Sequence, residues 1–360
     1  MTEVDTTPRE LPLWPDHAAA GARPMPVCGW TLPAHYGDPE AEYRAATESV
    51  AILDASFLTT VIGEGKDALD YLNRRLSQRV IQFQPGDGAR ASQLNAEGRM
   101  EADLEVFQLE PQRSLLLAPP AVSGAYLSSL CEKYVFSEDA RFPDLTGEWA
   151  LFALFGPKVP DVLTTFGGDS DIPAGKIVPL ADGIQAFRSE FLPGAVALLV
   201  PADQGREALA RLTSLATGLG GRRLGFMAFD TIRVESGTPW WGIDLTAKSI
   251  PLDADLFSAI HTNKGCYPGQ ETIAKILNLG HPARKMMGVH FEGDDAPPTG
   301  TPLMDGGREV GTLTSSTWSP RLNRPIGLAM MKWSHREPGT RVEISAGAVS
   351  GILASLPMVS

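Results

Sequence analysis

Cysteine is scarce in this chain of 360 residues, which has only Cys28, Cys131 and Cys266. The three are widely separated, odd in number and form no C-x-x-C pair, which argues against a disulfide framework and favours a reducing, cytoplasmic compartment. An iron–sulfur cluster carried by the chain commonly needs four thiolates, and a structural zinc ion needs four close-set cysteine or histidine ligands. Cysteines alone assemble neither site, so we expect no stably bound metal.

Long hydrophobic runs and an excess of basic residues are also missing. The longest apolar stretches, residues 149–155 and 195–200, are far shorter than the roughly 20 residues that span a bilayer. Lysine and arginine total 31 against 43 aspartates and glutamates, which gives a formal net charge of -12. Because affinity for nucleic acids rests on basic residues that displace counterions, we expect neither a membrane segment nor a direct nucleic-acid partner.

The order of local patterns predicts an α+β protein with several parts. The first residues are acidic and rich in proline, which indicates a flexible tail over residues 1–23. Helical and alternating patterns then occur in two successive blocks, followed by short alternating segments typical of a small antiparallel barrel or sandwich. We therefore predict a first α+β subdomain over 24–147, a second over 148–285, and a C-terminal β-barrel over 286–360. Within the blocks we expect helices at 42–53 and 66–80, a hairpin turning at 95–98, and a strand at 231–235.

The segment with the most unusual chemistry is residues 261–271, followed by a short amphipathic helix. Gly265, Pro268 and Gly269 force a tight backbone around Cys266. A helix that starts near Gln270 directs its unpaired N–H groups and the positive end of its dipole toward that turn, which would stabilise a thiolate. Lys264 acts in the same direction, so we expect a lowered pKa for Cys266. Cys28 and Cys131 lack this setting and are predicted to be inert or packed.

A local basic island surrounds this segment in an otherwise acidic protein. Between residues 261 and 290 there are four basic side chains, those of Lys264, Lys275, Arg284 and Lys285, and one acid, Glu271. One interpretation is an anion site for the carboxylates of a ligand tail. The other is a helix start whose basic side chains are simply solvated, and charge alone does not distinguish the two.

The same segment resembles the signature of one protein family. The residues that match it are Lys264-Gly265-Cys266-Tyr267-x-Gly269-Gln270-Glu271. They are similar to the motif of the YgfZ family of folate-binding proteins. The resemblance implies a folate-binding protein in which Cys266 is the functional thiol.

The rest of the chain resembles the wider superfamily that includes the T-protein of the glycine cleavage system, an aminomethyltransferase that uses tetrahydrofolate. The matching segments are Gly29-Trp30-x-x-Pro33-x-x-Tyr36-Gly37, Leu53-Asp54-x-Ser56, Leu94-Asn95-x-x-Gly98, Arg233-x-Glu235-x-Gly237, Gly242-x-Asp244, Gly311-x-Leu313-Thr314-Ser315 and Ser319-Pro320. This resemblance implies a three-part ring around a central folate cavity with the β-barrel at the C-terminal end.

The resemblance also implies roles for single residues in binding tetrahydrofolate or a related folate. Glu235 matches the glutamate that binds the pterin edge, and a carboxylate that accepts two parallel hydrogen bonds suits that edge. Arg233 belongs to the same motif, and Lys264 and Trp240 are further candidate contacts, although large aromatic residues are more often core. The T-protein has adjacent aspartates where this chain has Ala102 and then Asp103. Asp103 is either a folate contact or part of the polar face of a strand.

Three functions follow from these features. The first is a tetrahydrofolate-binding accessory protein that supports assembly or repair of iron–sulfur clusters in client enzymes through Cys266. The second is a tetrahydrofolate-dependent aminomethyltransferase or demethylase, although the acid missing at Ala102 puts that reaction in doubt. The third is a relative that uses the same pocket for another heterocyclic ligand, since a fold alone does not determine function.

Overall fold

A computed structural model describes residues 8–169, 171–344 and 350–359. Contacts divide the chain into two units, the first made of Met1–Leu72, Val80–Ala89 and Leu104–Phe229, and the second of Asn73–Arg79, Arg90–Asp103 and Asp230–Ser360. Strands β6 (Gly88–Leu94) and β7 (Met100–Glu110) each begin in one unit and end in the other. The predicted subdomain 148–285 is thus shared between the two units, which interleave along the chain.

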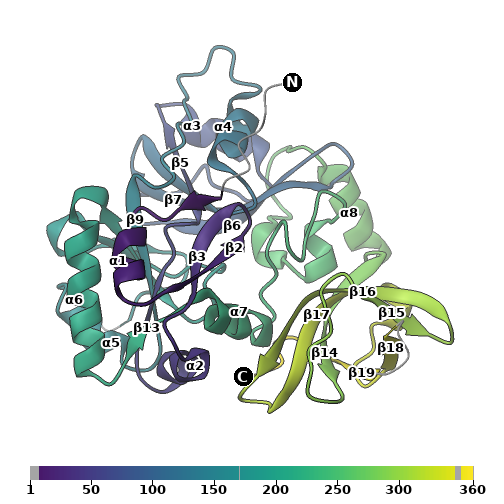
Figure 1. The fold of residues 1–360 in the computed structure, drawn as a ribbon. Coiled ribbons are helices and arrows are strands. Elements are labelled where there is room, and N and C mark those ends of the chain that lie inside the picture. The colour runs from purple at the N-terminus through teal and green to yellow at the C-terminus, as the bar shows by residue number, and fades with distance from the viewer. Residues whose placement is uncertain (1–7, 170, 345–349, 360) are drawn as a thin grey trace, which may run out of the picture. The chain divides into compact units, whose positions relative to one another are not determined.

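The first unit contains a six-stranded sheet with the order β10-β11-β12-β9-β4-β13. Figure 1 labels β9 and β13 of this sheet and the helices α5 and α6 of the same unit. Helices α5 and α6 pack on it through a core that includes Leu163, Leu209 and Leu212. Apolar side chains at nearly every position of β9 are typical of a strand that is covered on both faces. Between α5 and α6 the chain forms three strands, β10, β11 and β12, and the sequence patterns did not indicate β10. The bounds are β4 Ala51–Asp54, β9 Trp149–Phe155, α5 Val159–Thr164, β10 Ile177–Pro179, β11 Gln185–Phe187, β12 Val196–Pro201, α6 Gly205–Gly218 and β13 Arg222–Arg223.

A second sheet has the order β5-β8-β7-β6. Strands β6 and β7 flank the turn 95–98 that the sequence predicts, and Gly98 has a φ of 75°, which glycine adopts without strain. The predicted helix 42–53 ends early, since residues 51–53 belong to β4. Its start is capped by Asp38, whose side chain accepts a hydrogen bond from the Ala41 N–H. The remaining bounds are α2 Pro39–Glu48, β5 Thr59–Glu64, α3 Ala68–Arg75, β8 Arg113–Ala118 and α4 Gly124–Glu132.

The N-terminal segment is structured from Arg9 onward, so the predicted flexible tail does not hold for these residues. It forms β1 (Arg9–Glu10), α1 (Trp14–Ala19), β2 (Arg23–Val27) and β3 (Trp30–His35). His17 is 1% exposed and bonds to Asp54 Oδ2 at 2.8 Å and to the Tyr36 hydroxyl at 2.7 Å. A buried polar side chain needs hydrogen-bond partners such as these. The proline-rich composition of the segment does not reveal that they exist. Residues 1–7 lie outside the described part of the chain.

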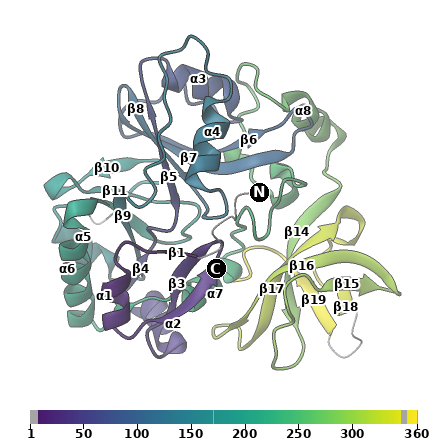
Figure 2. The same ribbon diagram turned by 45° about the horizontal axis from the view of Figure 1, so that its top comes forward.

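The second unit ends in a closed antiparallel barrel with the order β14-β17-β16-β15-β18-β19 (Figure 2). Adjacent residues on β14 serve two cores, since Met287 points into the barrel and Met286 packs with Ile273 of α8 (Gln270–Leu279) on the other side. The predicted barrel is confirmed, and β15 and β19 are strands that the sequence patterns did not indicate. The bounds are β14 Arg284–Phe291, β15 Pro302–Asp305, β16 Arg308–Ser319, β17 Arg324–Lys332, β18 Arg341–Ile344 and β19 Ser350–Ala354.

Candidate functional site

Residues 264–269, here called the motif loop, lead directly into helix α8. Gly269 is the residue before the helix and has a φ of 77°, a left-handed conformation that favours glycine. A Cβ at this position would lie 2.6 Å from the Asn95 carbonyl oxygen, so the loop and the turn 95–98 are in close backbone contact. The predicted helix start near Gln270 is confirmed. Cys266 is exposed, whereas Cys131 is buried and Cys28 is partly buried.

Lys264 directs its ammonium group to the backbone. Its Nζ donates to the carbonyl oxygens of Asn73 at 2.5 Å, Leu76 at 2.5 Å and Gln78 at 2.8 Å. Asn73 lies in the last turn of α3, where helix carbonyls lack partners within the helix, and Leu76 and Gln78 follow that helix. Burial lowers the pKa of Lys264 to about 8, and the charge of Arg79 contributes to this shift. The side chain therefore ties the motif loop to the segment 73–78, while its role toward a ligand stays a prediction.

Acids from a neighbouring loop pair with part of the predicted basic island. Arg284 Nη2 lies 2.8 Å from Asp253 Oδ2, and Lys285 Nζ lies 2.7 Å from Asp255 Oδ2. The two aspartates lie about 30 residues before their partners in sequence, outside the window in which the island was counted. Two of the four basic side chains in residues 261–290 are therefore paired with acids from outside that window. The four do not form one free anion site.

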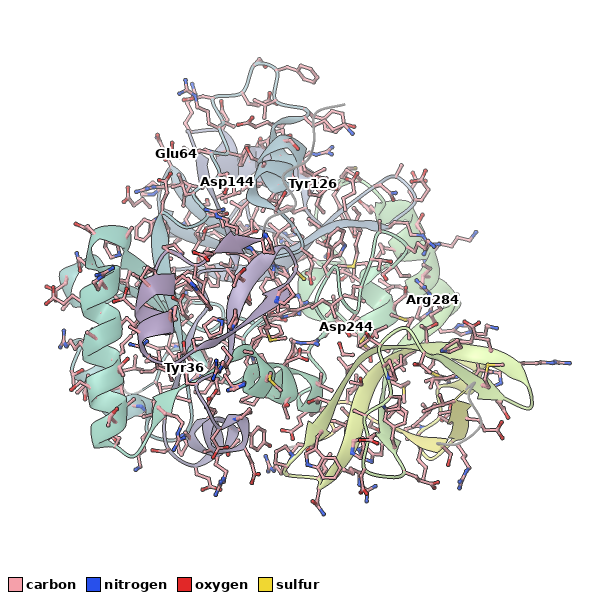
Figure 3. All side chains as sticks on the ribbon, viewed as in Figure 1. Tyr36, Glu64, Tyr126, Asp144, Asp244 and Arg284 are labelled. Atoms are coloured by element: carbon pink, nitrogen blue, oxygen red, sulfur yellow. The ribbon has the colours of Figure 1, made fainter. Side chains whose placement is uncertain are left out.

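Arg233 is the centre of a buried hydrogen-bond network, which we call the Arg233 cluster (Asp230, Arg233, Asp244, Thr314 and Ser315). The guanidinium is 1% exposed and donates to Asp230 at 2.8 Å, Asp244 at 2.6 Å and the Ser315 hydroxyl at 2.7 Å. Asp244, labelled beside the barrel in Figure 3, also accepts from Thr314 Oγ1 at 2.7 Å. Burial alone would lower the pKa of Arg233, but the charges of Asp230 and Asp244 raise it above its ordinary value. The arginine is thus held as a permanent cation that joins α7 (Phe226–Glu235) to β16.

Glu235 is the last residue of α7 and is 5% exposed. The strand predicted at 231–235 is therefore wrong, because this segment is helical. The Ser319 hydroxyl, at the end of β16, donates to Glu235 Oε1. The backbone carbonyl of Glu235 accepts from the N–H of Met358 at 2.9 Å. Glu235 is thus a buried carboxylate with a fixed orientation and not a solvated acid at the end of a strand.

Asp103 forms a buried ion pair with Arg90. The Arg90 Nη2 and Asp103 Oδ2 atoms are 2.5 Å apart, and the two side chains are 3% and 0% exposed. A second bond of 3.1 Å runs from Arg90 Nε to Asp103 Oδ1, so the pairing is bidentate. Asp103 is not part of a polar strand face that is exposed to solvent, because the strand is covered at this position. Its contact with a folate stays a prediction.

Trp240 is fully buried, at 0% exposure. The Arg233 guanidinium carbon lies 5.7 Å from the centroid of its ring. Its backbone N–H donates to Asp244 Oδ2 at 3.0 Å, so the tryptophan is held by the Arg233 cluster. Both contacts support the core role that large aromatic residues commonly have.

Metal-binding groups and membrane-spanning helices were sought in the described ranges, residues 8–169, 171–344 and 350–359. Within them, no three histidine, cysteine, aspartate or glutamate side chains are grouped so that they could hold a metal ion. No helix there has the length and apolar character needed to cross a membrane.

Comparison with known proteins gives consistent matches over up to 98% of the chain. Residues 13–182 match the GCVT N-terminal domain, and residues 284–357 match the glycine cleavage T-protein C-terminal barrel domain. An aminomethyltransferase of Saccharopolyspora erythraea is 30% identical over 98% of both chains. One of Rubrobacter xylanophilus is 29% identical over 98% of this chain and 94% of that one. The chain belongs to the T-protein (aminomethyltransferase) family.

The T-protein fold is also found by structural comparison. The aminomethyltransferase T of Bartonella henselae superimposes with a TM-score of 0.89, covering 98% of each chain at 24% identity. At that identity the likeness shows the fold, which is the mixed α+β arrangement with a C-terminal barrel expected from the sequence.

Segments quoted separately for their T-protein resemblance meet in one place in this structure. Arg233, Asp244 and Ser315 come from three such segments and are joined through the Arg233 cluster, and Ser319 from a fourth bonds to Glu235. Sequence reasoning named Arg233 and Glu235 as site residues but missed their partners. It also missed Arg90, although an arginine on the strand opposite Asp103 in a predicted hairpin was a usable signal.

Proposed function

We propose that this chain binds a tetrahydrofolate and acts as a YgfZ-type accessory protein for iron–sulfur enzymes, with Cys266 as its functional thiol. The observation that carries the proposal is the contrast between the thiol of Cys266 and the position of Ala102. The thiol of the motif loop is exposed to reaction partners, whereas the acid expected in a transferase is replaced by Ala102 and its neighbour Asp103 is committed to Arg90.

Folate binding rests on Glu235 in this proposal. The Ser319 hydroxyl orients its carboxylate through a hydrogen bond, and a preorganised acceptor suits the donor pair on a pterin edge. Arg233 supports that orientation from two residues away by fixing the end of α7 against the barrel. In the proposal Arg233 is therefore a positioning residue, and Glu235 is the contact.

The experiment for folate binding is calorimetric titration of tetrahydrofolate into the purified protein and into Glu235→Gln. Glu207→Gln, an exposed acid on α6, is the matched control. We expect at least a tenfold weaker affinity for Glu235→Gln, about 1.4 kcal/mol or more, and no change for the control. Equal affinity in all three proteins would remove Glu235 from the proposal.

The experiment for the accessory role replaces Cys266 by alanine in cells that lack the native protein. We expect activities of client iron–sulfur enzymes to fall with Cys266→Ala and to be retained with Cys28→Ala. Unchanged activities in both strains would contradict the functional thiol.

The alternative is a tetrahydrofolate-dependent aminomethyltransferase or demethylase. Full-length similarity to proteins named aminomethyltransferase supports it more directly than it supports the accessory role. Formation of methylene-tetrahydrofolate from an aminomethyl carrier protein or an N-methyl substrate would favour this alternative. If that product forms at rates typical of an enzyme while Cys266→Ala has no effect in cells, the accessory role is wrong.

A further inference from the structure

We propose that the second unit has a separate binding groove for a small organic anion, formed by Arg99, Lys248 and Arg284. The groove has a volume of about 540 Å³. The turn 95–98, the loop before η3 (Pro251–Ala254), helix α8 and the start of β14 all contribute to its walls. None of the residues assigned to folate binding, and no residue of the motif loop before α8, lines it.

The two arginines converge on a single atom. Arg99 Nη1 and Arg284 Nη2 both donate to the carbonyl oxygen of Lys248, the latter at 2.9 Å. Two guanidinium groups are therefore within hydrogen-bond reach of one oxygen although they lie on segments 185 residues apart. Like charges held this close repel each other, and an anion between or beside them offsets that repulsion.

One acid already neutralises part of the positive charge of the groove. Asp253, which is 2% exposed, pairs with Arg284 at 2.8 Å and accepts from the Ile250 N–H at 3.2 Å. Burial raises the pKa of Asp253, and the charge of Arg284 opposes that shift. Glu97, on the exposed turn, is the other acidic residue of the lining. Three cations thus face two acids, in a protein whose net charge is -12.

Most donors of these cations point to no protein acceptor within the described residues. Arg99 uses one side-chain nitrogen, Arg284 uses one, and the ammonium of the exposed Lys248 makes no hydrogen bond or ion pair there. A guanidinium presents five N–H donors in a planar fork that fits a carboxylate or phosphate through two parallel bonds. The remaining donors are therefore suited to bidentate recognition of such a group.

The other residues that line the groove determine what kind of molecular body can carry the anionic group of the ligand. Ile250, Ile276 and Pro282 give the groove an apolar wall. His281 adds a flat ring, which stacks on Trp333 with centroids 4.6 Å apart and an angle of 10° between the planes. Its Nδ1 lies 2.9 Å from the Pro282 carbonyl oxygen, which orients the ring. Cations beside an apolar wall and a flat ring fit a ligand with a carboxylate or phosphate on an apolar or aromatic body.

The test uses titration calorimetry of the full-length protein with benzoate, phenyl phosphate, inorganic phosphate and uncharged benzamide. We expect benzoate or phenyl phosphate to bind at least tenfold more tightly than both benzamide and inorganic phosphate. Which of the two binds better identifies the anionic group. The affinity should fall as salt is raised from 20 to 300 mM, about the range over which exposed charges become screened.

Variants locate the binding. Arg99→Gln and Lys248→Gln should each weaken the preferred anion about tenfold. Lys275→Gln, which removes an exposed charge of α8 outside the groove, should leave the affinity unchanged. Glu235→Gln should also bind the anion like the unmodified protein, so failure of folate binding and failure of this groove are distinguishable. The proposal is overturned if benzamide binds as tightly as the anions, or if Lys275→Gln weakens them as much as Arg99→Gln.

Discussion

At the scale of single residues, the Arg90–Asp103 pair shows how much a charge depends on its partner when solvent is excluded. Both side chains are nearly or fully buried. Removal of one partner leaves the other charge uncompensated, which typically costs about 3–5 kcal/mol, whereas apolar replacement of both is often close to neutral. We expect Asp103→Leu to lower the free energy of unfolding by about that amount in urea titrations, and Arg90→Met/Asp103→Leu to recover part of the loss. Additive losses in the double variant would contradict this account.

The cysteines give a second residue-scale prediction, because their exposure differs. Cys266 is exposed, Cys28 is partly buried, and Cys131 is 2% exposed in the core. Since reaction of a thiol requires access, we expect an aromatic disulfide reagent to label Cys266 first in the native protein and Cys131 only after denaturation. Peptide mapping by mass spectrometry identifies the labelled sites. Protection of Cys266 would show that the motif loop is packed differently, and rapid native labelling of Cys131 would show that α4 does not bury this thiol.

At the scale of elements, two glycines of the motif loop are expected to differ although both belong to the same signature. Gly269 has a φ of 77° and no room for a Cβ, whereas a Cβ on Gly265 meets nothing within 4 Å. A non-glycine residue in the left-handed region costs about 1–3 kcal/mol where the surroundings cannot adjust. We expect Gly269→Ala to lower the melting temperature by several degrees and Gly265→Ala to leave it nearly unchanged, as measured by circular dichroism.

Elements with a clear hydrophobic period were predictable, and those whose form depends on distant partners were not. The hairpin around residues 95–98, the helices α5 and α6, and four of the six barrel strands follow from local alternation or helical spacing. Helix α7 was mistaken for a strand at 231–235 because Thr231, Ile232 and Val234 are β-branched, which favours strands locally. Its helical form is supported by bonds of Arg233 to Asp244 and Ser315, which no local pattern contains.

The same limit applied to the candidate site. The motif loop and its following helix could be predicted because glycine and proline act on their own backbone. The destination of the Lys264 ammonium could not, since its acceptors Asn73, Leu76 and Gln78 lie about 190 residues earlier in the chain. Charge counts within a sequence window failed for Arg284 and Lys285 for a related reason, because their aspartates fall outside that window.

At the scale of the whole molecule, the chain cannot be divided by a single cut into its two units. The second unit takes the segments Asn73–Arg79 and Arg90–Asp103 from within the first part of the sequence. These segments supply the acceptors of Lys264, the Ser77 carbonyl that accepts from the His261 N–H at 3.0 Å, and the turn against which Gly269 packs. The motif loop and α8 therefore depend on residues that a C-terminal fragment lacks, whereas the barrel is closed by its own six strands.

A fragment of residues 230–360 should for this reason fold only in part. We expect limited proteolysis to cleave it readily between residues 246 and 283, where the missing segments leave Lys264, the His261 N–H and Gly269 without their partners. The barrel strands from Arg284 should resist cleavage, because β14 pairs with both β17 and β19 and so leaves no free edge. The full-length chain, digested in parallel, should be protected across 246–283. Equal protection of that region in the fragment would mean that the motif loop is organised by residues 230–360 alone, and the hydrogen bonds of Lys264 to the segment 73–78 would then be dispensable for its structure.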